Sequence, residues 1–141
     1  MGLTEVERNA IVKYRLERAK DTFFDVELAI KNMRCNNAAN RLYYACYYAA
    51  MALLINDGHI ARTHSGVKAL LGLHYATQNK INSDLMKAYR KMFNLRQTGD
   101  YDDLAAITMD DILELYEPAE QFIQTIENLI NNNNLTPQIM T

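Results

Sequence analysis

The spacing of apolar residues constrains the fold of this chain most strongly, because such residues recur every three to four positions along almost its whole length. Only five glycines and two prolines interrupt the 141 residues. No segment shows the alternation of apolar and polar residues that is typical of a β-strand. The pattern therefore predicts an all-α fold, an antiparallel up-and-down bundle of four to five helices joined by short connections.

Local signals mark the ends of the expected helices. Thr4 and Glu7 have the spacing of a capping box, Thr63 can cap a later helix, and Gly58 suits the left-handed position after a helix end. Pro118 lies inside the last segment, where a straight helix would lose about 3 kcal/mol, so we expect a kink or two abutting segments there. The five helices are predicted at residues 4–33, 38–55, 64–76, 82–99 and 108–130.

The length and composition indicate one domain. A hydrophobic content of 49% is enough for a single buried core in a chain of this size. Residues 1–130 are predicted to form one helical domain. Residues 131–141, which begin with a run of four asparagines, are predicted to form a polar flexible tail.

The charges nearly cancel, since 15 Lys and Arg residues face 17 Asp and Glu residues and leave a net charge of -2. A global basic excess that would drive non-specific binding to nucleic acid or anionic membranes is therefore excluded, and any such site must be local. Cys35 and Cys46 are too few and too far apart for a disulfide framework or a metal cluster. We expect no metal and no cofactor.

The sequence also bears on the compartment. The two thiols are typical of a reducing cytosol, and residues 1–10 lack the apolar stretch of a signal peptide. The longest apolar run, at residues 43–55, is too short to cross a bilayer. We therefore expect a cytoplasmic protein with no membrane partner.

The expected second helix is apolar or aromatic on two sides. Leu42, Cys46 and Leu53 form part of one stripe, while Tyr44 and Tyr48 belong to the other side. Because both faces favour burial, this helix is predicted to be central in the bundle or shared with a second copy of the chain. A homodimer built around it and part of the fourth helix is the expected assembly.

Three blocks occur in a fixed order along the chain. They read Ala-Ala-Asn-Arg-Leu-Tyr-Tyr-Ala at 38–45, Thr-His-Ser-Gly-Val at 63–67 and Leu-Arg-Gln-Thr-Gly-Asp-Tyr at 95–101. Together they resemble the HEPN family, in the bacterial and archaeal branch with an Asn-Arg-x-Tyr-Tyr-Ala helix and a later Arg-x-x-x-Asp-Tyr. The resemblance covers about residues 3–129. It implies a helical bundle that commonly dimerises and is often encoded beside a minimal nucleotidyltransferase in a toxin and antitoxin pair.

The resemblance also implies a chemistry. Many members of the family are metal-independent ribonucleases, whose motif is an Arg followed after four to six residues by a His, with two copies meeting at the dimer interface. In this chain the window after Arg96 holds Asp100 and Tyr101 but no His. In related toxins a tyrosine just beyond the motif receives a nucleotide from the partner enzyme, so Tyr101 is a candidate for modification; the alternative is a tyrosine at the edge of the core.

Metal-free RNA cleavage requires a base, an acid and fixed positive charge. Arg96 can supply the charge, and Asp100 lies one helical turn further on, although an ion pair between the two is the plainer interpretation. Histidine suits proton transfer at neutral pH better than an Asp with an ordinary pKa of about 3.9. His64 is the histidine that can replace the missing one, because the bundle can bring it near Arg41 or Arg96; a local hydrogen-bonding role is the alternative.

Asn40, Arg41 and Tyr44 bring amide, guanidinium and phenol groups close together at helical spacing. Such groups can stack on a base and contact a phosphate. Packing in the core or at a dimer interface is the alternative role for the tyrosines.

Three functions follow from these patterns. The first is a HEPN-like partner of a nucleotidyltransferase-type protein, acting as the regulatory or toxin component of a toxin-antitoxin-like pair. The second is a metal-independent ribonuclease at a homodimer interface, using Arg96, Asp100 and His64. The third is a nucleotide-binding module with RNA or a nucleotide held by Asn40, Arg41, Tyr44 and Tyr101.

Overall fold

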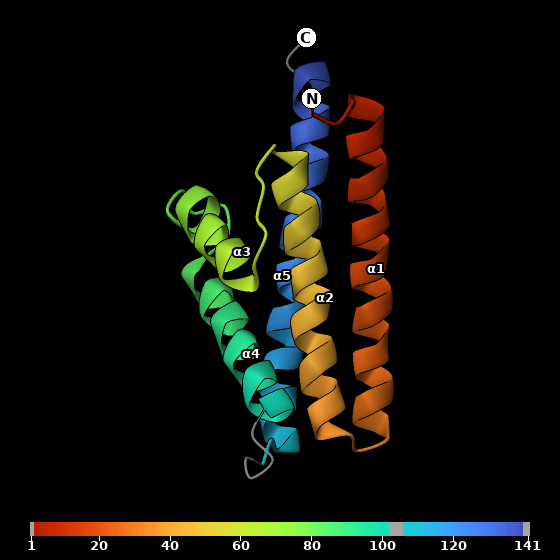
Figure 1. Cartoon of the computed structure of the whole chain (residues 1–141), viewed down its shortest axis with the longest axis vertical. Helices are drawn as coiled ribbons and strands as arrows, with labels where there is room; N and C mark the ends of the chain where they lie inside the picture. The colour runs from red at the N-terminus through yellow and green to blue at the C-terminus, as the bar shows by residue number, and fades with distance from the viewer. Residues whose placement is uncertain (1, 102–105, 140–141) are drawn as a thin grey trace.

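The computed structural model describes residues 2–101 and 106–139, with side chains described for residues 2–97 and 106–132. Every regular element in these residues is helical, as the apolar spacing predicts (Figure 1). The elements are α1 (Glu5–Lys31), α2 (Cys35–Asn56), α3 (His64–Leu71), a π-helical turn η1 (Gly72–Ala76), α4 (Ser83–Tyr101) and α5 (Met109–Ile139). The predicted all-α bundle is confirmed.

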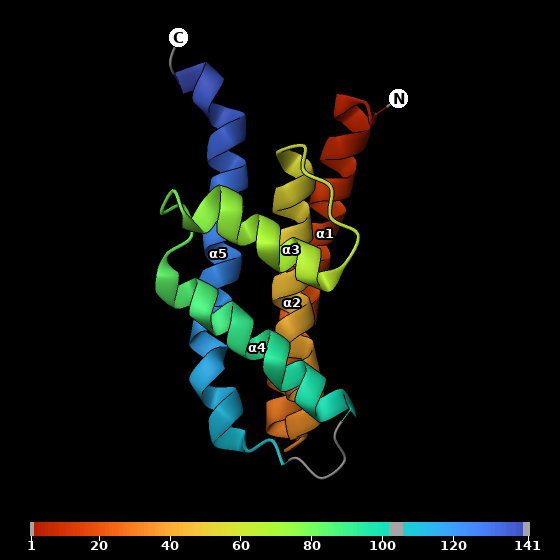
Figure 2. The ribbon, with the colours of Figure 1, turned by 60° about the vertical axis from the view of Figure 1, so that its left-hand side comes forward.

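Helix α2 occupies the centre of the bundle. It contacts α1, α3, α4 and α5. Helices α1 and α2 run antiparallel along their lengths, and α5 runs behind α2 in the view of Figure 1 and also contacts α1. Helix α4 crosses in front of α2 and α5 obliquely, with the short α3 above it (Figure 2). The prediction that the second helix is central is confirmed, and its position between four neighbours explains why both of its sides are apolar or aromatic.

The turn between the first two helices is tighter than the sequence pattern indicates. Helix α1 ends at Lys31, before the predicted Met33, and α2 begins at Cys35, so the polar break is shorter than expected. Met33 has a φ of 57°, in the left-handed region. The Arg34 amide donates to the Ala29 carbonyl at 2.9 Å, which closes the end of α1. These backbone bonds, and not the polarity of the side chains, fix the length of the turn.

The predicted caps are present. The Thr4 hydroxyl accepts from the Glu7 amide at 3.1 Å while the Glu7 carboxylate accepts from the Thr4 amide at 2.9 Å. The Thr63 hydroxyl accepts from the Gly66 amide at 2.9 Å and starts α3. Gly58 has a φ of 83°, as the turn after α2 requires. These ends were predictable because a cap is a local hydrogen bond.

The third predicted helix, 64–76, changes geometry part-way. Helix α3 ends at Leu71, and Gly72–Ala76 continue it as the π-helical turn η1. Within that turn the Tyr75 hydroxyl donates to the Asp57 carboxylate at 2.5 Å. The wider turn carries Tyr75 to the end of α2.

The last two helices run further than predicted. Helix α4 continues past Gly99 to Tyr101, so Tyr101 lies in the helix and not in the loop where the sequence pattern places it. Helix α5 is one element from Met109 to Ile139 and continues through Pro118, which corrects the alternative of two abutting segments. Helix α5 also continues past residue 130, in the segment for which the run of four asparagines predicts a polar tail. Apolar residues mark only the part of a helix that packs on a core. The apolar pattern therefore ends before the helix does.

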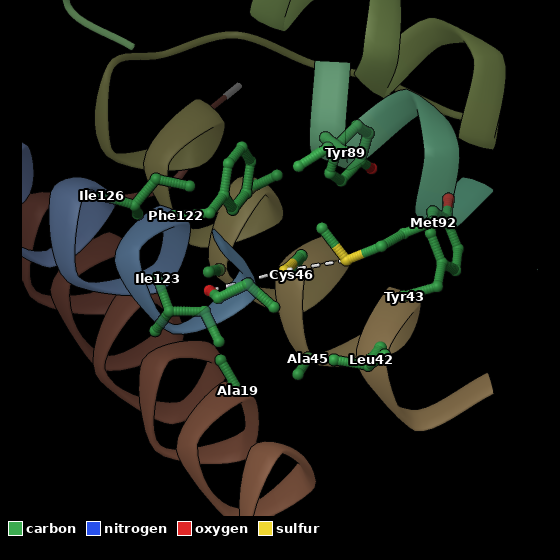
Figure 3. Close-up of a cluster of buried hydrophobic side chains, with 14 of the residues drawn as sticks. Ala19, Leu42, Tyr43, Ala45, Cys46, Tyr89, Met92, Phe122, Ile123 and Ile126 are labelled. Carbon is green, nitrogen blue, oxygen red and sulfur yellow. Dashed lines mark hydrogen bonds between the residues drawn. The ribbon is translucent and has the colours of Figure 1, made fainter. Parts of the chain in front are cut away.

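The core lies where α1, α2, α4 and α5 meet (Figure 3). Phe122 of α5 stacks on Tyr89 of α4 with ring centroids 5.1 Å apart. The Cys46 sulfur, fully buried, lies 3.8 Å from both the Met92 sulfur and the Ala119 carbonyl oxygen. In the described part of the chain no helix combines the length and apolar character needed to span a bilayer.

Candidate functional site

Two candidate residues from different helices meet around one buried tyrosine. Tyr43 of α2 is fully buried, and a 2.7 Å hydrogen bond joins its hydroxyl to Nδ1 of His64. The Arg96 guanidinium of α4 lies 5.1 Å from the centre of the Tyr43 ring. Arg96 is itself only 8% exposed. We call Tyr43, His64 and Arg96 the Tyr43 cluster; its formation confirms that the bundle brings His64 near Arg96.

Local structure explains how each member is positioned. The Thr63 cap places His64 at the first residue of α3, which contacts α2. Arg96 follows Met92 and Phe93, two buried residues of α4. Phe93 packs edge-on against Tyr43 with ring centroids 5.7 Å apart. The apolar contact of α4 with α2 therefore places the Arg96 guanidinium over the Tyr43 ring.

The cluster fixes the protonation of its members. Burial raises the pKa of Tyr43 to about 12, so its hydroxyl keeps its proton at neutral pH. Burial and, secondly, the Arg96 charge lower the pKa of His64 below its ordinary 6.5. His64 is therefore uncharged at neutral pH, and its Nδ1 is hydrogen-bonded to the Tyr43 hydroxyl. The neutral imidazole of His64 can accept a proton, and the neighbouring positive charge of Arg96 can bind an anion.

A second group of aromatic residues continues from the cluster along α2. The rings of Tyr44, Tyr47 and Tyr48, which we call the tyrosine triad, have centroids 5.8 to 6.1 Å apart. All three side chains are half-buried. Tyr47 stacks on His64 with centroids 4.3 Å apart, and Arg96 lies 5.7 Å from the Tyr44 ring. The triad and the Tyr43 cluster thus share one surface.

Asn40 and Arg41 stand at the start of this surface. The Arg41 Nε and Nη2 atoms donate to the Asn40 amide oxygen at 3.1 and 2.7 Å. The same guanidinium lies 5.6 Å from the centre of the Tyr44 ring. The structure therefore brings together five of the residues proposed from sequence: Asn40, Arg41, Tyr44, His64 and Arg96.

The other two lie outside this description. Asp100 and Tyr101 are within α4, but their side chains fall outside the described residues, so neither the proposed ion pair of Asp100 nor the environment of Tyr101 is tested. His59 is half-buried and stacks on His74 with ring centroids 4.0 Å apart. Among the described residues, no group of three His, Cys, Asp or Glu side chains is arranged to hold a metal ion.

Sequence reasoning missed several residues of this surface. The sequence pattern favours packing for Tyr43, although its hydroxyl orients His64. Arg18 of α1 lies over Tyr48, 4.4 Å from the ring centre, and Lys68 of α3 lies 4.5 Å from the centre of Phe93. The three-residue spacing of Arg15 and Arg18 was a signal for one basic helix face. Nothing in the sequence shows that this face adjoins the tyrosines.

The comparisons with known proteins establish the family. The model of the HEPN domain matches residues 12–129. The chain belongs to the HEPN family. A relative from Thermotoga maritima, named UPF0332 protein, is 36% identical over 126 residues, which cover 89% of this chain and 96% of the relative.

Further similarities concern an archaeal relative and a solved structure. A protein of Methanocaldococcus jannaschii with the name "Putative toxin MJ0605" is 26% identical over 115 residues, covering 82% of this HEPN chain and 85% of the relative. The crystal structure of TT1696 from Thermus thermophilus superposes with a TM-score of 0.72 at 18% identity, covering 83% of this chain and 96% of that one. The second similarity supports the fold alone.

Proposed function

We propose that this HEPN protein is a toxin-like component that cleaves RNA without a metal ion at the Tyr43 cluster. The observation that carries the proposal is the meeting of Arg96 and His64, from α4 and α3, around Tyr43. The name of the archaeal relative, which includes the word toxin, supports the same class of activity. The absence of a His in the window after Arg96 is compensated in this proposal by His64.

The cluster supplies the groups that the reaction needs. Arg96 holds the phosphate and stabilises the charge that develops on its oxygens. His64 accepts the proton of the 2′-hydroxyl at Nε2, in the tautomer whose Nδ1–H donates to the Tyr43 oxygen. The 2′-oxygen then bonds to phosphorus, the bond to the 5′-oxygen breaks, and that oxygen takes a proton from water. The product is a 2′,3′-cyclic phosphate.

A cleavage assay with matched variants tests this function. Short single-stranded RNA is incubated with the protein in excess EDTA, and Arg96→Ala is expected to reduce the rate by about 10² to 10³-fold because a charge at the transition state is lost. Arg90→Ala, which removes an exposed arginine of the same helix, serves as the control and should retain the wild-type rate. Equal rates for wild type and Arg96→Ala, or no cleavage by the wild type, would reject the proposal.

The partners predicted from the family resemblance extend the proposal. A second copy of the chain would bring two Tyr43 clusters to one RNA, which light scattering and cleavage by mixed wild-type and Arg96→Ala samples can test. A nucleotidyltransferase partner would restrain the toxin by modifying Tyr101. Purification from the native host should then recover such an enzyme, and incubation with it and ATP should add the mass of an adenylate; a Tyr101→Phe control should show no gain.

A further inference from the structure

Helix α1 exposes large apolar side chains to solvent. Of the nine large apolar residues that are exposed in the described part of the chain, four belong to this one helix: Val6, Tyr14, Phe24 and Leu28. The two aromatic residues are the largest of these, and Tyr14 is 60% and Phe24 59% exposed. Apolar side chains gathered on one exposed surface are typical of a site that another molecule covers.

These four residues share one side of α1. At about 100° per residue they fall within about 80° of one another around the helix axis, and they span about 33 Å along it. The buried residues of the helix, among them Val12 and Val26, lie about 180° away from them. In Figure 1, α1 stands at one edge of the bundle, and α3 and α4 stand at the opposite edge. The side that carries the four residues, which we call the outer α1 face, is therefore the side turned away from the packed core.

Three carboxylates run along the same face. Glu17, Asp21 and Asp25 follow one another at four-residue intervals, and all three are exposed. The ion pairs among the described residues are Lys20 with Glu127 and Lys91 with Glu114, and neither includes a member of this row. Like charges one turn apart destabilise a helix. A ligand that supplies positive charge would relieve this repulsion.

The arginine next to the row is directed elsewhere. Arg18 follows Glu17 in the chain, but its guanidinium lies over the Tyr48 ring of α2, 4.4 Å from the ring centre. It is therefore directed toward the bundle and not along the row of carboxylates. The outer α1 face thus combines apolar side chains with negative charge.

This combination selects among the molecules that could cover the face. An anionic membrane surface would be repelled by the three carboxylates. A two-fold pairing of α1 with the α1 of a second copy, centred on the row, would bring the carboxylates of both copies together. A partner with apolar and basic side chains meets neither cost. The homodimer predicted from sequence uses the second and fourth helices, so it leaves the outer α1 face uncovered.

We infer that the outer α1 face is a docking surface for a basic amphipathic helix of a partner protein. The apolar residues of that helix, at three- and four-residue intervals, cover Tyr14, Phe24 and Leu28. Its lysines or arginines pair with the row of carboxylates. The inference does not depend on RNA cleavage, because the outer α1 face includes no member of the Tyr43 cluster.

A designed peptide serves as the probe. It is labelled with fluorescein and repeats a heptad with leucines at the a and d positions and lysines beside them, over about 21 residues, which as a helix span about 32 Å. Its binding to the full chain is followed by fluorescence anisotropy. A second peptide carries glutamate in place of every lysine and is expected to bind about tenfold more weakly or worse, because it meets carboxylates of the same sign. Added salt should weaken the lysine peptide, since it screens the attraction.

Variants of the chain locate the bound peptide. Phe24→Ser is expected to raise the Kd of the lysine peptide about tenfold, because aromatic side chains supply much of the binding energy at such contacts. Leu28→Ala should raise the Kd by a smaller factor. Glu17→Gln should raise the Kd and make it less sensitive to salt. Circular dichroism checks that each variant keeps its helices, as expected for changes at exposed positions.

Helix α5 offers a matched control for each kind of change. Leu113→Ala removes a leucine that is exposed like Leu28, and Glu117→Gln removes an exposed carboxylate. Both should leave the Kd at its wild-type value. Equal effects of Leu28→Ala and Leu113→Ala, or equal affinity for the lysine and glutamate peptides, would overturn the docking surface.

The outcomes also separate this inference from the proposed function. Binding of the lysine peptide by a chain that does not cleave RNA would support the docking surface and reject the reaction. Cleavage that depends on Arg96, without any binding of the peptide, would do the reverse. Light scattering addresses a second copy: a wild-type dimer that Phe24→Ser converts to monomer would show that α1 pairs with another copy, and the inference would be rejected.

Discussion

The two sides of α2 differ in the size of their side chains. One side carries alanines, namely Ala38, Ala45, Ala49 and Ala52, all of them fully buried. The other carries the tyrosine triad, whose members are all half-buried. Small side chains such as alanine let neighbouring helices approach closely along their length, whereas large aromatic rings fill the space where helices cross at an angle. The alanine side therefore serves packing, and the tyrosine side leaves groups available for a ligand.

Among the substitutions predicted from this comparison, a larger side chain on the alanine side should change the free energy of unfolding most. Ala49→Leu is expected to lower the free energy of unfolding by about 1–3 kcal/mol, because a close-packed core has no room for three more carbons. Tyr48→Leu, the matched change on the tyrosine side, should cost less than about 1.5 kcal/mol because it keeps an apolar side chain at a half-buried position. Urea denaturation measures both.

A result in the opposite order would break the comparison. If Tyr48→Leu destabilised the protein more than Ala49→Leu, the triad would belong to the core and would not be a ligand surface. Unchanged slopes of unfolding free energy against urea would confirm that both variants keep the native extent of burial.

Much of the fold was predictable from sequence because its signals are local. The Thr4 and Thr63 caps and the turn at Gly58 each depend on a few neighbouring residues. The turn at Met33 and the π-helical turn at Gly72–Ala76 were not predicted, because backbone hydrogen bonds and a distant partner, Asp57, determine them.

The candidate site was predictable only in part. Motif residues such as Arg96 and His64 could be named, and their approach was expected from the bundle. The part played by Tyr43 and the position of Arg18 over Tyr48 depend on which helix faces meet. Apolar periodicity shows which side of a helix is buried, but it does not show which helix covers it.

Removal of one hydroxyl tests the link between the core and the site. Tyr43→Phe keeps the buried ring but loses the hydrogen bond to Nδ1 of His64, which should lower the unfolding free energy by about 1 kcal/mol. The rate of RNA cleavage should fall as well, since the imidazole loses the group that orients it. Stability equal to wild type, together with an unchanged rate, would show that Tyr43 only fills space.

The pH dependence of stability gives the smallest expected effect. Because the pKa of His64 in the folded protein lies below its ordinary 6.5, the unfolded chain binds the proton more readily. The contribution of His64 is therefore complete above pH 6.5 and declines as the pH falls through the lowered value. His64→Gln should remove this decline, as seen by comparing urea denaturation of the two proteins between about pH 5 and about pH 7.5. If the wild type became more stable relative to His64→Gln as the pH fell, the predicted sign of the effect would be wrong.

The buried thiol of Cys46 is a built-in chemical probe of how often the helical bundle opens. Burial raises its pKa, so the thiol stays protonated and shielded from solvent at neutral pH. An alkylating reagent can reach it only when α4 or α5 separates from α2, whereas Cys35, at the start of α2, is half-buried and reacts sooner. The ratio of the two labelling rates therefore reports how often the bundle opens, without any engineered probe.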